Sequence, residues 1–207
     1  MTAKVEWLTV AGDADVWRSL GLVVSDDGLI PLMGTCVRVV RPVGTGVGLV
    51  SWALSGVDAG LDGGVIDGLS TAVVEPLGPI FGSHELGASG LDHVVVMTND
   101  LDRTSTAIDA AMGCELKRVR EVGTMRQGFH RIGRGGLIVE VVERPEIDKG
   151  PAAFWGLVLN VDDLDAACDR IGEGRISAPK DAVQPGRRIA TIDKDVGLGL
   201  PVALMTT

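Results

Sequence analysis

The chain has 207 residues, of which 45% are hydrophobic and 23% are charged, a balance typical of a folded globular protein. Its formal net charge of −9 argues against a nucleic-acid partner, because binding to phosphates needs a basic surface. No apolar run reaches the length of about 18 residues that a membrane span requires, so we expect no membrane association.

The cysteines and the start of the chain indicate a cytoplasmic protein. Cys36, Cys114 and Cys168 are scattered and lack the close spacing of zinc ligands, so we expect buried thiols in a reducing compartment. The first residues also lack the basic and apolar regions of a secretory signal peptide.

The first 90 residues contain short predicted elements. The valine-rich residues 5–10 and 37–40 predict strands. Between them, an acidic start predicts a helix over Asp13–Leu20, which Gly21 ends. A weaker signal of the same kind follows at Val57–Asp62.

From residue 91 the same order returns more fully. An apolar strand over residues 91–96 precedes a helix over Leu101–Met112, with Asn99 or Asp100 as N-cap and Gly113 as C-terminal stop. Three more strands are expected near residues 115–122, 125–132 and 137–142.

A further copy begins at residue 154. It has a strand over residues 154–161, a helix over Leu164–Ile171 capped by Asp162 or Asp163, and strands up to Met205. The chain therefore repeats a unit of strand, helix and several strands, and the first 90 residues hold a weak version of it.

Two ionisable residues interrupt strands that otherwise look buried. His93 lies among apolar neighbours, and Glu140 lies within a run of valines. A buried carboxylate is costly unless it meets a cation, a metal or hydrogen bonds. Strand alternation can place both residues on an inward face. The pair is then either half of a metal site, or a satisfied core histidine and a glutamate that pairs with an arginine.

These residues carry a family resemblance. The segment Leu91-Asp92-His93-Val94-Val95-Val96, with the helix start at residues 99–102, resembles the opening of a vicinal-oxygen-chelate domain. This superfamily includes glyoxalases, bleomycin-resistance proteins and extradiol dioxygenases. Its later strands resemble residues 125–133, 138–142, 155–163 and 197–207.

The resemblance implies an α+β fold in which paired βαβββ modules form curved mixed sheets around a cleft. Residues 91–207 would be one glyoxalase-like domain. Residues 1–82 would be a shortened and diverged copy, joined to it by a linker over residues 83–90.

Metal-dependent members of this superfamily place ligands on the first, fourth, fifth and last strands. The first two positions carry over as the metal-ligand candidates His93 and Glu140, and Glu140 is also the catalytic candidate. The other two fall on Gly156 and near Ala203, which cannot bind a metal.

Corresponding positions in the first half look like Trp7 and Arg38, so the missing ligands would have to come from His84, from His130 or from another subunit. The resemblance thus implies either no cofactor or a divalent metal (Mn, Fe, Ni or Zn) in an incomplete site.

Metal-free relatives bind organic ligands in the cleft, and four residues are candidates for substrate binding here. Arg126 and His130 are four residues apart on one strand and therefore share a face. Trp155 would form an aromatic wall with Phe154. Arg38 suits a carboxylate or phosphate, although an ion pair between Arg38 and Glu140 is an equally simple interpretation.

Three functions remain open. The first is a metal-free protein that binds a small organic ligand, with a degenerate metal site. The second is a divalent-metal-dependent lyase, isomerase or dioxygenase that acts on a small molecule with vicinal oxygens. The third is a non-catalytic protein whose modules supply a dimer surface. A monomer and a homodimer are both compatible with the predicted modules.

Overall fold

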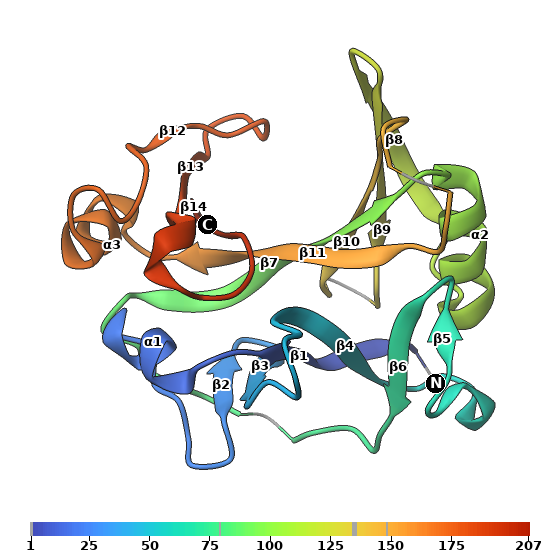
Figure 1. The fold of residues 1–207 in the computed structure, drawn as a ribbon, viewed down its shortest axis with the longest axis horizontal. Coiled ribbons are helices and arrows are strands. Elements are labelled where there is room, and N and C mark those ends of the chain that lie inside the picture. Colours follow the sequence, from blue (N-terminus) through green and yellow to red (C-terminus); the bar gives the residue numbers. More distant parts are fainter. Residues whose placement is uncertain (1, 79, 134–135, 148) are drawn as a thin grey trace. The chain divides into compact units, whose positions relative to one another are not determined.

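The computed structural model describes residues 2–78, 80–133, 136–147 and 149–207 (Figure 1). Within these ranges two mixed sheets form. The strands of the first sheet have the spatial order β2-β3-β1-β4-β6-β5 and are β1 (Lys4–Ala11), β2 (Leu29–Leu32), β3 (Thr35–Val40), β4 (Gly48–Ser55), β5 (Val65–Ile66) and β6 (Leu69–Val73).

The strands of the second sheet have the order β12-β13-β14-β11-β7-β10-β9-β8. They are β7 (Ala88–Thr98), β8 (Leu116–Val122), β9 (Met125–Arg131), β10 (Ile138–Glu143), β11 (Ala153–Val161), β12 (Lys180–Asp181), β13 (Arg188–Thr191) and β14 (Val202–Thr206). Each sheet contains parallel pairs, such as β4 with β6 and β7 with β10, beside antiparallel neighbours. The predicted α+β fold with mixed sheets is confirmed.

Helices are few and short in the described chain. They are α1 (Ala14–Ser19), α2 (Leu101–Met112) and α3 (Leu164–Ile171), with single 3₁₀ turns η1 (Ala59–Leu61) and η2 (Lys194–Val196). Among the described residues, no helix is long and apolar enough to cross a membrane. Cys36 and Cys114 are buried free thiols as predicted, whereas Cys168 on α3 is only half-buried.

The chain divides into two compact units. The first unit comprises Met1–Leu8, Val50–Gly78 and His93–Trp155. The second unit comprises Thr9–Leu49, Pro79–Asp92 and Gly156–Thr207. Each unit thus takes segments from both halves of the sequence. The domain boundaries predicted at residues 82 and 91 stay a prediction.

Helix α2 begins and ends where the sequence indicates. The side chain of Asp100 accepts a hydrogen bond from the backbone N–H of Arg103 at 2.9 Å, which makes Asp100 the N-cap. Gly113 ends the helix in the left-handed conformation, with φ of 63°. The buried residues Leu101 and Ile108 form the apolar side of α2, which packs on β9 and β10 within the first unit.

Strand register defines two faces of the sheet beneath α2. Residues opposite one another in neighbouring strands share a face, and β10 aligns Ile138 with His93 and Glu140 with Phe129. One face, called here the His93 face, therefore carries His93, Gln127, Phe129, Ile138 and Glu140. The other, called the α2 face, carries Arg126, Gly128, His130 and Glu143. A Cβ added to Gly128 would lie 2.9 Å from Leu101 Cδ1, so α2 needs a glycine below it.

The strands and helix that follow repeat this arrangement. We call β7, α2, β8, β9 and β10 the α2 module, and β11, α3, β12, β13 and β14 the α3 module. In the second unit, α3 packs on β13 and β14 through Leu164, Ala167 and Ile171. A separate apolar cluster contains Val158, Ala203, Met205, Ala182 and Ile189.

The first 90 residues hold a shortened version of the same order. Helix α1 has six residues, because Asp13 acts as its N-cap and Leu20 as its C-cap. Where a second helix is indicated by the repeat, η1 forms only a single 3₁₀ turn, capped by Asp58. The helical segments here are therefore shorter than α2 and α3.

Candidate functional site

His93 and Glu140 meet on the His93 face. Nε2 of His93 lies 3.3 Å from Oε2 of Glu140, and each side chain is 13% exposed. The other carboxylate oxygen, Oε1, accepts a hydrogen bond from Nε2 of Gln127 at 2.8 Å. All three residues belong to the first unit. The structure thus brings together the two residues that the sequence singles out as possible metal ligands.

Gln127 is the member of this cluster that sequence reasoning missed. Its Oε1 is buried and has no hydrogen-bond partner in the described part of the chain. Gln127 stands opposite Val142 on β10, which places its side chain beside Glu140. The even spacing of Gln127 and Phe129 would have grouped them on one face, but only the strand register shows which face that is.

The α3 module has the equivalent positions without the ligands. Glu140 pairs with Val95, two residues after His93. Ala203 pairs with Val158, two residues after Gly156. The same register in both modules supports the assignment of Gly156 and Ala203 to the fifth-strand and last-strand positions.

Neither of these two positions suits a metal ligand. A Cβ added to Gly156 would lie 2.6 Å from the carbonyl oxygen of Pro201, so a histidine does not fit on the present backbone. Ala203 is 9% exposed and packs in the apolar cluster with Val158 and Met205. A carboxylate there would be buried among apolar side chains.

The remaining histidines serve the interior of the protein. His84 accepts a hydrogen bond from the Val23 backbone N–H at Nδ1 (3.0 Å) and donates from Nε2 to the Pro31 carbonyl oxygen (2.7 Å). His130 donates from Nδ1 to the Cys114 carbonyl oxygen at 2.7 Å, and burial lowers its pKa. His130 also lies on the α2 face, away from His93 and Glu140.

A four-ligand metal centre therefore does not fit the described residues. No group of three His, Cys, Asp or Glu side chains comes together among them in an arrangement that could hold a metal ion. A zinc-type site needs at least three protein ligands, and the His93 face offers His93 and Glu140.

Arg126 and His130 share a face, as their spacing predicts, but it is the α2 face. The Arg126 guanidinium donates to Asp102 at 3.2 Å and to Glu143 at 3.2 Å, and its hydrogen bond to Asp102 raises its pKa. Glu143 in turn accepts the Leu101 backbone N–H at 2.7 Å. Arg126 thus helps to fix the start of α2. Its predicted role in substrate binding stays a prediction that this geometry does not favour.

Trp155 and Arg38 are the two other residues predicted to bind a ligand. Trp155 is 46% exposed. Its neighbour Phe154, on the opposite side of β11, packs edge-on against Trp52 with ring centroids 5.2 Å apart. Arg38 is half-buried in the middle of β3, opposite Leu29, in the second unit. Ligand binding by Trp155 and Arg38 stays a prediction.

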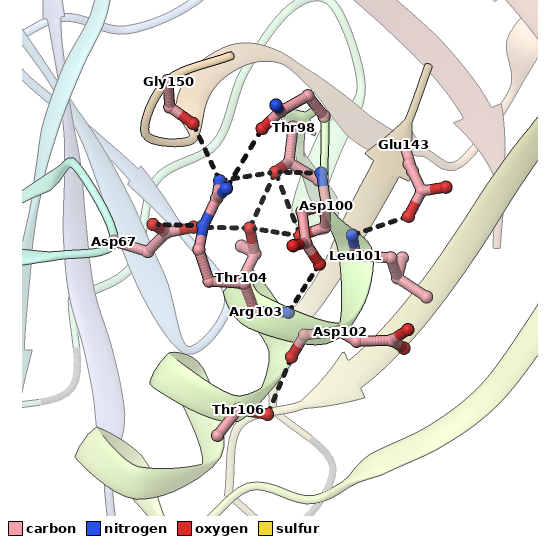
Figure 2. Close-up of polar contacts among 11 residues, drawn as sticks. Asp67, Thr98, Asp100, Leu101, Asp102, Arg103, Thr104, Thr106, Glu143 and Gly150 are labelled. Atoms are coloured by element: carbon pink, nitrogen blue, oxygen red, sulfur yellow. Dashed lines mark hydrogen bonds and ion pairs between the residues drawn. The ribbon is translucent and has the colours of Figure 1, made fainter. Parts of the chain in front are cut away.

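A second polar cluster joins α2 to the β5–β6 turn (Figure 2). Arg103 donates to Asp67 Oδ1 at 2.9 Å, to the Gly150 carbonyl oxygen at 2.9 Å and to Thr98 Oγ1 at 3.2 Å. Thr104 Oγ1 donates to Asp67 Oδ2 at 2.5 Å. Asp67 has a positive φ of 46°, a conformation that aspartate tolerates better than most residues. Because these side chains form hydrogen bonds with one another, we assign the cluster the role of holding α2 to the β5–β6 turn.

The second unit has a surface pocket of about 730 Å³ beside α1. Its charged lining residues are Asp13, Asp15, Arg18, Asp26, Asp27 and Arg41. Asp13 caps α1, Arg18 pairs with Asp15 at 2.7 Å, and Asp27 accepts from Ser25 Oγ at 2.5 Å. Four of these six charges serve the helix and the turn, and we assign no chemistry to this pocket.

Comparison with known families decides the relationship. The family model of the Glyoxalase/Bleomycin resistance protein/Dioxygenase superfamily matches residues 90–195. The chain belongs to this superfamily. The matched segment contains His93, Glu140 and Gln127, which form the cluster on the His93 face.

Solved structures share the fold of this chain, in one case over nearly its whole length. A mutant of 4-hydroxymandelate synthase from Streptomyces coelicolor is 14% identical, with a TM-score of 0.64, and the match covers 99% of this chain and 92% of that one. Methylmalonyl-CoA epimerase from Mycobacterium tuberculosis is 20% identical, with a TM-score of 0.50, over 58% of this chain and 89% of that one. The comparison with curated proteins gives no match.

Proposed function

We propose that this glyoxalase-superfamily protein binds a small organic ligand on the His93 face and that its metal site is degenerate. The observation that carries the proposal is the cluster of His93, Glu140 and Gln127, in which polar atoms converge on one sheet face. At the equivalent positions of the α3 module, Gly156 and Ala203 supply no ligand.

The cluster suits the recognition of a polar ligand. Glu140 presents a carboxylate beside His93 and accepts a hydrogen bond from Gln127. The buried Oε1 of Gln127 lacks a donor among the described residues and is a second acceptor. A ligand with an O–H or N–H group could satisfy this oxygen of Gln127 beside Glu140.

An alternative function is favoured by the short distance between His93 and Glu140. An imidazole nitrogen and a carboxylate oxygen 3.3 Å apart are compatible with two ligands of one divalent ion. With ligands from outside these residues, the protein would be a metal-dependent lyase, isomerase or dioxygenase that acts on vicinal oxygens, with Glu140 as ligand and base. The known relatives named above are enzymes, and the missing ligands argue against this reading here.

Metal content separates the two functions. The tag-free wild type and a His93→Ala/Glu140→Ala variant would be analysed by plasma mass spectrometry after incubation with Mn, Fe, Ni or Zn. We expect no stoichiometric metal in either protein. About one metal per chain in the wild type, lost in the variant, would overturn the proposal in favour of the metal enzyme.

A ligand screen tests the binding function itself. Small molecules would be screened by thermal shift against the wild type, Glu140→Gln and a matched control, Glu146→Gln, which removes the same charge from an exposed loop position. We expect at least one compound to stabilise the wild type and the control but not Glu140→Gln. Hits that stabilise all three proteins equally would contradict a site at Glu140.

Three further expectations stay predictions. These are the cytoplasmic location, the homodimer and the non-catalytic role as a dimer surface. The molecular mass measured in solution tests the homodimer, and it also bears on the role as a dimer surface.

A further inference from the structure

Two arginines extend the His93 face toward the edge of the sheet. Strand β8 is the outermost strand beside β9 in the eight-stranded sheet (Figure 1). Its register with β9 sets Arg118 opposite Phe129 and Arg120 opposite Gln127. Since opposite residues share a face, both arginines lie on the His93 face. An irregularity between Leu116 and Arg118 produces this register, which sequence spacing alone does not reveal.

Both arginines lack a polar partner among the described residues. Within the part of the chain that the structure describes, Arg118 and Arg120 make no side-chain hydrogen bond or ion pair. Six other arginines of this acidic protein form ion pairs with carboxylates, namely Arg18, Arg103, Arg126, Arg170, Arg187 and Arg188. The contrast is sharpest on one hairpin, where Arg126 on the α2 face contacts two carboxylates.

The spacing of these side chains defines the size and chemistry of a ligand. Arg118 and Arg120 are two residues apart, so their Cα atoms are about 7 Å apart and two guanidinium groups can approach one anion. In the same row, Phe129 separates Arg118 from Glu140, at about two strand spacings or roughly 10 Å. The face therefore offers cations at one end, an aromatic ring between, and hydrogen-bonding groups at the other end.

We infer that the ligand of the His93 face is an organic anion, whose carboxylate or phosphate is bound by Arg118 and Arg120. The inference rests on the proposed function and adds the chemical class of the ligand. Arginine suits this task because its planar fork donates two hydrogen bonds to a carboxylate or phosphate. The body of the ligand would lie over Phe129, and its polar end would reach Glu140 and Gln127.

Charged residues on an edge strand also have a simpler use, which is to prevent pairing with other chains. That role requires charge on β8 but does not require a particular face, and Lys117 beside these residues would serve it equally well. The experiment must therefore measure anion binding and compare variants that remove the same number of cations.

The test is an amide NMR titration with three probes: benzoate, phenyl phosphate and the neutral analogue benzamide. Four proteins are compared: wild type, Arg118→Gln/Arg120→Gln, the charge-matched control Lys117→Gln/Arg144→Gln, and Arg118→Lys/Arg120→Lys. The last variant keeps the edge charge if the glutamine variant self-associates. Signals of Gln127 and Phe129 report binding on the His93 face.

In the wild type and the control, we expect at least one anion to bind about tenfold more tightly than benzamide. In the glutamine variant, the anion should bind no more tightly than benzamide. The lysine variant should keep part of the preference for the anion, because charge remains but the fork is lost. Preference for benzoate or for phenyl phosphate identifies the anionic group.

Equal weakening in the glutamine variant and the charge-matched control would overturn the inference, because general electrostatics would then suffice. Benzamide binding as tight as that of the anions would overturn it and leave the proposed function standing. Absence of any shift with all three probes would also overturn it, whereas the proposed function is decided separately by the response of Glu140→Gln in the ligand screen.

Discussion

In the α2 module Glu140 pairs with Val95, and in the α3 module Ala203 pairs with Val158. The third strands match as well: Phe129 stands opposite Glu140, and Thr191 stands opposite Ala203. By the same register Gln127 corresponds to Ile189. Two modules with one backbone plan thus present a polar cluster in one case and an apolar cluster in the other.

This difference shows that the fold fixes positions and leaves their chemistry open. The pairing register decides which residues share a face, and any side chain that fits can occupy those places. In the α2 module these register positions carry side chains that form hydrogen bonds with one another. In the α3 module they carry groups that pack. A functional site in one module therefore does not imply one in the other.

The largest effect is expected from giving the α3 module the carboxylate of the α2 module. Ala203→Glu would bury a carboxylate among Val158 and Met205, at a cost of about 3–5 kcal/mol in the free energy of unfolding near neutral pH. Burial raises the pKa of such a group, so the cost is present above its unfolded pKa of about 4.3 and shrinks as pH falls toward that value.

Urea unfolding near neutral pH and near pH 4 measures this loss. Ala153→Glu is the control, because Ala153 is exposed at the start of β11 and its substitution should change stability little. Similar stabilities of the two variants would mean that position 203 tolerates a ligand, which would remove the main contrast between the modules.

A smaller loss of stability is expected from removing the ion pairs that α2 and α3 form with neighbouring strands or turns. Asp67→Ala removes the acceptor of Arg103 and Thr104 (Figure 2). Because the Asp67 side chain is 10% exposed and Thr104 is fully buried, the loss should cost about 2 kcal/mol. Asp165→Ala breaks the matching contact of α3 with Arg188, but both partners are exposed, so we expect little change.

Chemical unfolding of both variants tests this contrast. A loss for Asp165→Ala as large as that for Asp67→Ala would show that exposure does not set the value of these contacts.

The smallest effect concerns His130, whose counterpart in the α3 module by register is Ile192. Burial lowers the pKa of His130 below its ordinary value of 6.5, so its folded form stays neutral where the unfolded chain takes up a proton. Stability should therefore fall as pH drops below about 6.5, and less so in His130→Ile.

Melting temperatures measured from neutral pH to about pH 5 check this prediction. Equal pH dependence in both proteins would assign the acid sensitivity to other groups. At neutral pH the variant should lose a little stability, because the Cys114 carbonyl group loses its donor.

Much of the fold could be predicted because its signals are local. The caps Asp100 and Asp163 and the stop at Gly113 mark helix ends by backbone chemistry that the sequence displays. Alternation indicated that His93 and Glu140 could each face inward, and the register between β7 and β10 places them on one face. The family match over residues 90–195 confirms the predicted superfamily.

The rest depends on contacts between strands. Arg126 and His130 were expected to line a cleft, and their spacing correctly places them on one face, but the register with β10 shows that this face lies against α2. The same register brings in Gln127, Arg118 and Arg120, which no motif marks. A shift by one residue would have exchanged the two sets.

The close approach of Gly156 to Pro201 has a consequence for how this protein can change over generations. Because the carbonyl oxygen of Pro201 occupies the space that any side chain at position 156 would need, no single codon change can supply a histidine there without moving the neighbouring strand. Evolution of a full set of metal ligands would first require a change in the backbone of the segment before β14. The present chemistry of this position is thus fixed by a glycine on β11 and by a backbone oxygen just before β14.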